Sequence, residues 1–155
     1  MAKSLLEEIR QTKPFEHPAD EAALSILRTA TVLERGSNEV LRPFGITHTQ
    51  YNVLRILRGA GARGLCGREV GERLISSVPD VSRLLDRMEE MELLKKERDS
   101  GDRRHVTARI TPKGRRLLER ATPDLEAYGR GRFEGLSDRA IEALTGALAA
   151  IRAAE

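Results

Sequence analysis

The alternation of apolar and polar positions is most regular between residues 77 and 114. Four apolar residues of this stretch share one face of a helix: Val81, Leu84, Leu85 and Met88. Their spacing of i, i+3, i+4 and i+7 predicts an amphipathic helix over 78–93. The opposite face is polar and carries Arg83 and Arg87, so basic side chains are expected on its exposed side.

After this helix the pattern changes from the helical period to the strand period. Val106, Ala108 and Ile110 alternate with polar residues and predict a strand over 106–110, paired with a strand over 94–98. The residues between them, 99–104, are rich in turn formers and end in two arginines. We therefore expect a two-stranded ribbon with a basic tip.

Two helix starts precede the ribbon. Residues 47–50 have the sequence of a capping box and begin one helix, and a short helix is expected over 68–75. Ser77 and Asp80 form a second box-like start, with Pro79 in the first turn, where its missing N–H is not needed. Two short helices joined by a tight turn, followed by a ribbon, predict a winged helix-turn-helix. Such a motif presents its second helix to a DNA major groove and its ribbon to the backbone or minor groove.

Long amphipathic helices are expected on both sides of this motif, and a short one at the start. Their expected ranges are 4–11, 20–41, 112 to either 129 or 132, and 138–153. Asp20 is expected to cap the second of these, with Gly36 as a weak point inside it. Pro123 is expected to kink the third helix or to restart it at Thr122. The fold class is therefore mainly α with a small β-wing.

The composition of the chain narrows the class of protein to which it can belong. The chain has 155 residues and one cysteine, Cys66, so it can fold around its own core and has no internal disulfide framework. It shows no long apolar run and no signal peptide, which indicates a soluble, cytoplasmic protein. Aromatic residues make up 3% of the chain, which argues against a base-stacking platform for single strands.

Charge is concentrated in one segment. Residues 95–120 hold ten Lys and Arg against four Asp and Glu, although the whole chain carries only +3. A basic segment on a mildly acidic remainder favours a localised contact with a polyanion, although a charged run is more often only a solvated face.

The chain offers little basis for catalysis or metal binding. His17, His48 and His105 are scattered and have no ligand-like spacing to Cys66, so no zinc site and no cofactor are expected. There is no phosphate-binding loop and no nucleophile elbow, so the chain is not expected to be an enzyme.

With these features the sequence resembles the MarR family of bacterial transcriptional regulators. Twelve residues match the family pattern: Val81, Arg83, Met88, Glu89, Glu92, Leu93, Leu94, Asp102, Arg103, Arg104, Thr111 and Gly114. Asp80 departs from it, because the family usually has a small neutral polar residue there. The resemblance implies a dimer built from the terminal helices, a palindromic operator and often a small phenolic or aromatic acid ligand between the lobes. It divides the chain into a helical dimerisation region, 1–45 and 112–155, and a winged DNA-binding domain, 46–111.

Candidate DNA contacts on the helix-turn-helix are Ser77, Asp80, Ser82, Arg83 and Arg87. Arginine can bind guanine O6 and N7 as a fork, and serine can donate to a phosphate or base edge. The alternatives are an arginine paired with a neighbouring carboxylate and, for Ser77, a helix cap alone. Asp80 either accepts from cytosine N4 or simply caps the helix, and the cap is slightly favoured.

Candidate contacts on the wing are Asp102, Arg103 and Arg104. We expect Asp102 to orient one arginine for a narrow minor groove. A flexible charged loop without function is the alternative.

Cys66 lies near a helix start, where a thiolate is favoured. Oxidation of this thiol is therefore an alternative trigger. The known oxidation-sensing members of the family carry their cysteine in the first long helix, however, so Cys66 is better explained as a small apolar residue in a strand.

The function expected from all of this is sequence-specific binding of double-stranded DNA by a nucleoid-associated homodimer, most often as a repressor. The alternatives are a winged helix used only for protein interaction and a sequence-indifferent nucleoid protein.

Overall fold

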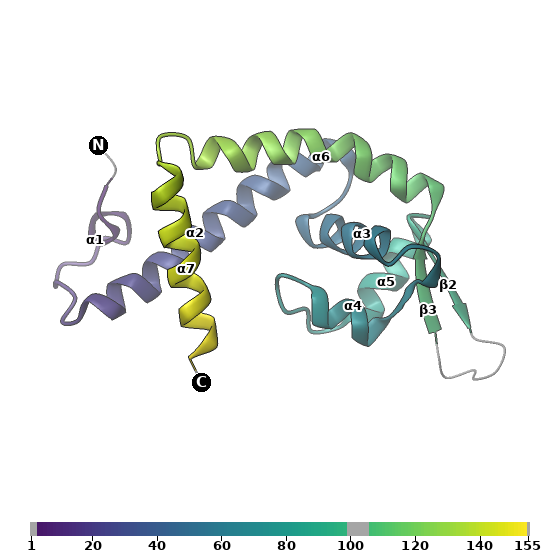
Figure 1. Cartoon of the computed structure of the whole chain (residues 1–155), viewed down its shortest axis with the longest axis horizontal. Coiled ribbons are helices and arrows are strands. Elements are labelled where there is room, and N and C mark those ends of the chain that lie inside the picture. Colours follow the sequence, from purple (N-terminus) through teal and green to yellow (C-terminus); the bar gives the residue numbers. More distant parts are fainter. Residues whose placement is uncertain (1–2, 99–105, 155) are drawn as a thin grey trace.

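The computed structural model describes residues 3–98 and 106–154 of the chain (Figure 1). Its elements, in chain order, are α1 (Leu5–Glu8), α2 (Pro18–Leu41), η1 (Arg42–Phe44), α3 (His48–Ala60), η2 (Gly61–Arg63), β1 (Leu65–Cys66), α4 (Gly67–Arg73), α5 (Val81–Glu90), β2 (Leu94–Arg98), β3 (Val106–Ile110), α6 (Pro112–Arg132) and α7 (Asp138–Ala153). The expected class, mainly α with a small β-wing, is confirmed.

The wing is part of a small antiparallel sheet. Strands β2 and β3 have the predicted bounds and pair with Leu94 opposite Ile110. The short strand β1 pairs with the other edge of β3, so the sheet order is β1-β3-β2. The predicted ribbon is therefore confirmed, and it is attached at its base to the segment that precedes α4.

The core lies where α3, α4, α5 and the sheet meet the middle of α6. Its fully buried large side chains are Leu41, Val53, Leu54, Leu57, Leu65, Val70, Met88, Leu93, Leu94 and Leu118. Tyr51, 5% exposed, packs with them, and its hydroxyl lies 2.9 Å from the hydroxyl of Thr122 on α6. The winged lobe is thus fixed to the long helix by apolar packing and a polar contact.

Helices α2 and α6 pack together along part of their length (Figure 1). Gly36 of α2 is buried, and a Cβ atom at this position would clash with the hydroxyl oxygen of Tyr128 on α6. That hydroxyl donates to the carbonyl of Val32 at 3.4 Å. Helix α2 continues through Gly36, the expected weak point, and the missing side chain makes room for Tyr128.

Several expected helix ends need correction. The N-cap of α2 is His17, whose Nδ1 accepts from the N–H of Ala19, and Asp20 lies in the first turn instead. Helix α6 does not restart at Thr122 and continues through Pro123. Helix α4 ends at Arg73, two residues before the predicted end. In contrast, the capping box at Thr47 and both bounds of α7 are as predicted.

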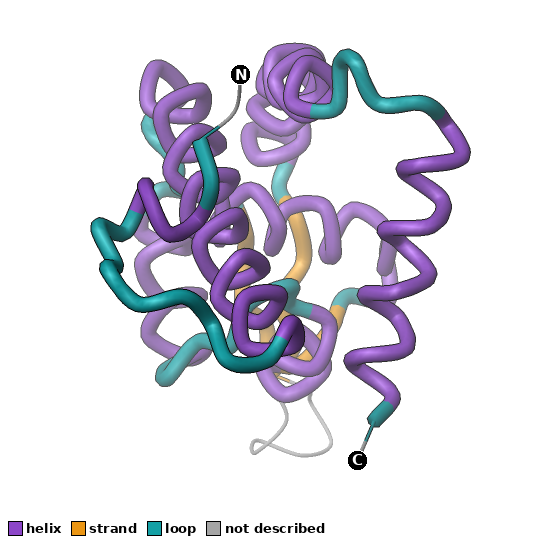
Figure 2. Tube along the Cα trace, turned by 90° about the vertical axis from the view of Figure 1, so that its left-hand side faces the viewer, coloured by secondary structure: helices purple, strands orange, loops and turns teal. Residues whose placement is uncertain are grey.

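The two ends of the chain extend away from the winged lobe. Helix α7 has no buried residue and lies at the edge of the molecule (Figure 2). Apolar side chains remain exposed on α2 and α7, with Leu27 at 64% and Ile151 at 56%. No helix in the described part of the chain is long and apolar enough to cross a membrane.

Candidate nucleic-acid interface

Helix α5 begins later than the sequence predicted. Its N-cap is Asp80, whose carboxylate accepts the backbone N–H of Arg83 at 2.9 Å. Ser77 lies three residues before this N-cap, in the turn after α4, and is exposed. The predicted start at Val78 is wrong because the residue before a proline is driven out of the helical region and towards an extended backbone. The cap interpretation of Asp80 is confirmed.

The exposed face of α5 carries the predicted basic residues. Ser82, Arg83 and Arg87 are all exposed, and the two arginines lie one turn apart. Within the described residues, neither arginine has a carboxylate oxygen within 4.0 Å. The suggested pairing with Asp86 or Glu90 is therefore absent there, and both guanidinium groups keep their donors available for an external acceptor.

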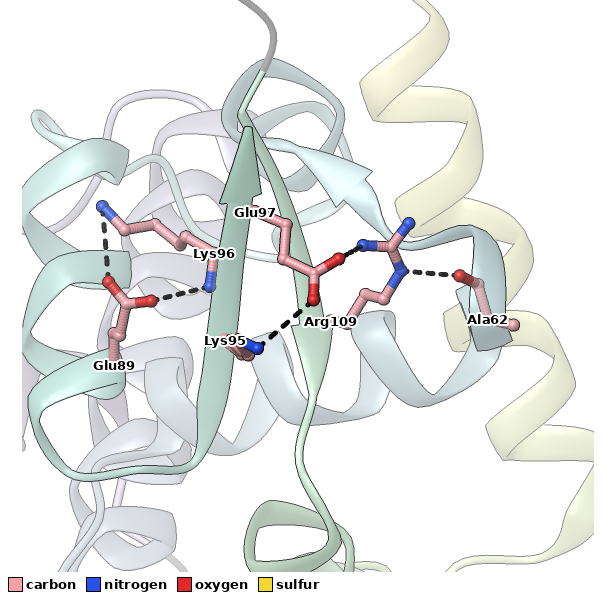
Figure 3. Close-up of polar contacts among 6 residues, drawn as sticks. All are labelled: Ala62, Glu89, Lys95, Lys96, Glu97 and Arg109. Atoms are coloured by element: carbon pink, nitrogen blue, oxygen red, sulfur yellow. Dashed lines mark hydrogen bonds and ion pairs between the residues drawn. The ribbon is translucent and has the colours of Figure 1, made fainter. Parts of the chain in front are cut away.

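The acidic residues of α5 are tied to the wing instead. Lys96 of β2 forms an ion pair with Asp86. Its Nζ also lies 3.9 Å from a carboxylate oxygen of Glu89 (Figure 3). The other oxygen of Glu89 accepts the backbone N–H of Lys96 at 2.7 Å. The side chain of Lys96 is only 23% exposed. Lys96 thus compensates acids that would repel phosphate and fixes β2 against the helix.

The base of the wing is held by a second polar group. Glu97 of β2 pairs with Arg109 of β3 at 2.5 Å and with Lys95 at 3.5 Å (Figure 3). Arg109 also donates to the carbonyl of Ala62 in η2 at 2.7 Å. These contacts join three segments at the base of the ribbon and position it beside α5. The candidates at its tip, Asp102, Arg103 and Arg104, lie outside the described residues.

The sequence analysis missed Ile75. It was assigned to the short helix before the turn, but it lies beyond α4 and is 72% exposed. Its backbone N–H donates to Oδ1 of Asn52, a largely buried side chain of α3, at 3.0 Å. An apolar side chain beside Ser77 has the chemistry to contact a thymine methyl group. A large apolar residue two positions after the end of α4 was the available signal.

Cys66 lies at the N-cap of α4 and is partly exposed. Its backbone N–H donates to the carboxylate of Glu69 at 2.9 Å, and this bond is the main cause that holds the pKa of Glu69 below its usual value. No group of three or more His, Cys, Asp or Glu residues in the described ranges is placed to hold a metal ion.

Comparison with known proteins gives one consistent family. Residues 44–105 match the MarR family. YsmB of Bacillus subtilis (strain 168), an uncharacterized HTH-type transcriptional regulator, is 28% identical over 84% of this chain and 87% of its own length.

Solved structures agree with this match beyond the matched segment. Sco5413, a MarR family transcriptional regulator from Streptomyces coelicolor, is 29% identical with a TM-score of 0.75, covering 87% of this chain and 93% of its own. CouR from Rhodococcus jostii RHA1, bound to p-coumaroyl-CoA, is 26% identical with a TM-score of 0.70, covering 91% and 98%. A second structure has the repressor CouR bound to a 23-mer DNA duplex, with 24% identity, a TM-score of 0.76 and coverage of 91% and 99%.

Proposed function

We propose that the chain, which matches the MarR family over residues 44–105, is a transcriptional regulator of this family and a homodimeric repressor that binds a palindromic operator. Binding of DNA to regulate transcription is the function of the family. Sequence specificity, dimerisation and repression are the finer parts of the proposal.

The observation that carries the proposal is the exposed face of α5. Arg83 and Arg87 lie there without a carboxylate partner among the described residues, while Lys96 compensates Asp86 and Glu89. A surface evolved only for protein contact is typically poorer in charge and richer in aromatic residues. We assign base or phosphate contact to both arginines and to Ser77 and Ser82. Asp80 acts as the helix cap.

The wing supplies the second contact of the proposed interface. We propose that Arg103 or Arg104 enters the minor groove and that Asp102 orients it. The base of the ribbon supports this, because Glu97, Arg109 and Lys96 fix its direction relative to α5. Contacts of this kind add affinity for all DNA and little base preference.

The helical ends are proposed as the dimer interface. Residues 1–45 and 112–155 form this region, and 46–111 form the DNA-binding domain. Leu24, Leu27, Leu144 and Ile151 are exposed in the single chain, which supports burial against a second copy. Two α5 helices then read half-sites about one DNA turn apart, ~34 Å.

A small aromatic acid is proposed to release the DNA. CouR, which is bound to p-coumaroyl-CoA in one structure, is a relative whose ligand carries an aromatic acyl group as a coenzyme A thioester. Such a ligand binds more tightly to a dimer whose two α5 helices are not spaced for the operator. It lowers operator affinity by the difference between its affinities for the two states of the dimer.

Selection of DNA from a random pool tests the whole proposal. We expect a sequence with two-fold symmetry and half-sites one helical turn apart. A gel-shift competition with random DNA then separates the alternatives. Equal competition would identify a sequence-indifferent nucleoid protein, and no shift at all would identify a protein-interaction module. Loss of DNA binding on oxidation, prevented by Cys66→Ser, would identify the thiol as the trigger.

A further inference from the structure

The described part of the winged lobe has one large apolar side chain that its own fold leaves exposed. Ile75 is 72% exposed, whereas the other exposed large apolar side chains of the described residues, such as Leu27 and Ile151, lie in the two helical ends. A second copy is proposed to cover those ends, but Ile75 lies apart from them, in the turn between α4 and α5 (Figure 1). A single exposed apolar side chain is common on protein surfaces, so the way in which Ile75 is held is the informative feature.

The residue before Ile75 sets the direction of its side chain. Leu74, the C-cap of α4, has an extended backbone with a φ of −65° and a ψ of 140°. Its side chain is half-buried and packs against the core of the lobe. Successive side chains of an extended backbone point to opposite sides, so the anchoring of Leu74 directs Ile75 towards solvent.

The backbone of Ile75 is fixed by a residue of another helix. Its N–H donates to Oδ1 of Asn52 on α3 at 3.0 Å, and Asn52 is only 9% exposed. A buried side-chain amide needs a hydrogen-bond partner, so this bond stabilises Asn52 as well as the turn. The end of α4 does not need it, because a helix C-terminus leaves carbonyl groups without partners and not N–H groups. The bond therefore serves to hold the turn in one place against α3.

The turn leads into the helix that is proposed to enter the major groove. Helix α5 follows the cap at Asp80, and Arg83 lies in its first turn. The N-terminal residues of such a helix are those that contact base edges, so the turn lies at the end of α5 that faces the bases. Ser76 and Ser77 are exposed beside Ile75, and their hydroxyl groups can donate hydrogen bonds. The turn thus presents one rigidly held apolar side chain and two donors.

This combination of groups matches thymine. In the major groove, thymine is the base that presents a methyl group, and its O4 is an acceptor. We propose that Ile75 is a specificity-determining residue that contacts a thymine methyl group in each half-site of the operator, with Asn52 as its positioning residue. The inference deepens the proposed function and rests on it, because it names a base that the proposed interface reads from outside α5.

Replacement of thymine by deoxyuridine tests the contact, because it removes the methyl group and keeps the base pair. Each thymine of the selected operator is replaced in turn, in both half-sites, and the dissociation constant is measured by fluorescence anisotropy. At one position the replacement should weaken binding of the natural chain by about 4-fold for each half-site, the effect of exposing one methyl group. Binding of Ile75→Ser should not change with the same replacement, whereas Ile75→Val, which stays apolar, should keep most of the effect.

Two further variants separate a contact from a change in folding. Ser76→Ala is the matched control, because Ser76 is exposed in the same turn and has no large apolar group. It should show the full deoxyuridine effect, whatever its own affinity for the operator. Asn52→Ala should reduce the effect, because it frees the turn, and Asn52→Asp, which keeps an oxygen acceptor, should preserve it. A general loss of structure would instead weaken binding to both operators equally and leave their ratio unchanged.

The outcomes distinguish this inference from the proposed function. If the natural chain and folded Ile75→Ser respond equally to deoxyuridine at every position, the thymine contact is overturned and operator binding stands. A chain that selects no sequence from the random pool would refute the proposed function and the inference with it. An unchanged ratio in folded Asn52→Ala would refute the positioning role of Asn52. Circular dichroism melting of each variant controls for folding.

Discussion

The winged lobe and the two ends of the chain use the same amphipathic pattern in different ways. In the lobe, the apolar faces of α3 and α5 are covered, and Leu57 and Met88 are fully buried. On α2 and α7 an equally regular stripe stays exposed, with Leu27 at 64% and Leu144 at 42%. Periodicity therefore identifies a face to be buried, but it does not say whether the cover comes from the same chain.

The largest effect is expected when charged residues are placed in the exposed apolar stripe of α7. Leu144→Glu with Ile151→Glu should dissociate the proposed dimer, because each unpaired charge buried in an interface costs ~3–5 kcal/mol. Light scattering should then give the 17.3 kDa of one chain and a circular dichroism spectrum still typical of a folded helical protein. A natural chain that is already monomeric at micromolar concentration would refute the dimer.

Removal of a core side chain gives the matched experiment in the lobe. Leu57→Ala should lower the free energy of unfolding by ~2–5 kcal/mol, because it leaves a cavity in a packed core. Urea denaturation at several protein concentrations distinguishes the two regions. The loss caused by Leu57→Ala should not depend on concentration, while the loss caused by Leu144→Ala should shrink on dilution, as expected for a residue that stabilises only through association. The same concentration dependence for both variants would contradict the distinction between a core within one chain and an interface between two chains.

Arg83→Ala tests a second difference, between residues that stabilise the winged lobe and residues that we propose to contact DNA. The change should leave stability nearly unaltered, since Arg83 is exposed. It should relax base preference at one operator position by ~1–3 kcal/mol, measured by competition with single-base operator variants. Equal losses on operator and random DNA would show that Arg83 contacts phosphate alone.

The smallest expected effect concerns pH. Burial in the first turn of α3 lowers the pKa of His48 below its usual value, with Glu34 opposing and Arg55 adding to the shift. As the pH falls, the unfolded chain therefore protonates His48 before the folded chain does. The free energy of unfolding then decreases below about pH 6.5. Between about pH 7.5 and about pH 5.5, His48→Gln should lose less unfolding free energy than the natural chain. An identical loss would show that other groups cause the pH dependence.

Local features of the fold were predictable because their causes are local. Thr47 and Gln50 cap α3 through bonds between residues three apart, and β2 and β3 follow from alternation within ten described residues. The start of α5 was misplaced where two local signals competed. Ser77 resembled a cap, but the carboxylate of Asp80 makes the bond to the helix.

Other features depend on residues that are distant in the chain. The pairing of β1 with β3 and the hydrogen bond from Arg109 to Ala62 depend on the tertiary structure. The same holds for the candidate site. Its basic residues were predictable from their spacing, whereas the compensation of Asp86 by Lys96 and the exposure of Ile75 were not.

The contact between Gly36 and Tyr128 has a consequence for how this sequence can vary. A Cβ atom at position 36 would occupy the place of the tyrosine hydroxyl, so a larger residue there requires a smaller one at position 128. Single substitutions at position 36 are then selected against, while paired changes are tolerated. Descendants of this chain should therefore show correlated substitution at these two sites, and a library randomised at both positions should yield folded proteins mainly as glycine with an aromatic residue or as two residues of intermediate size.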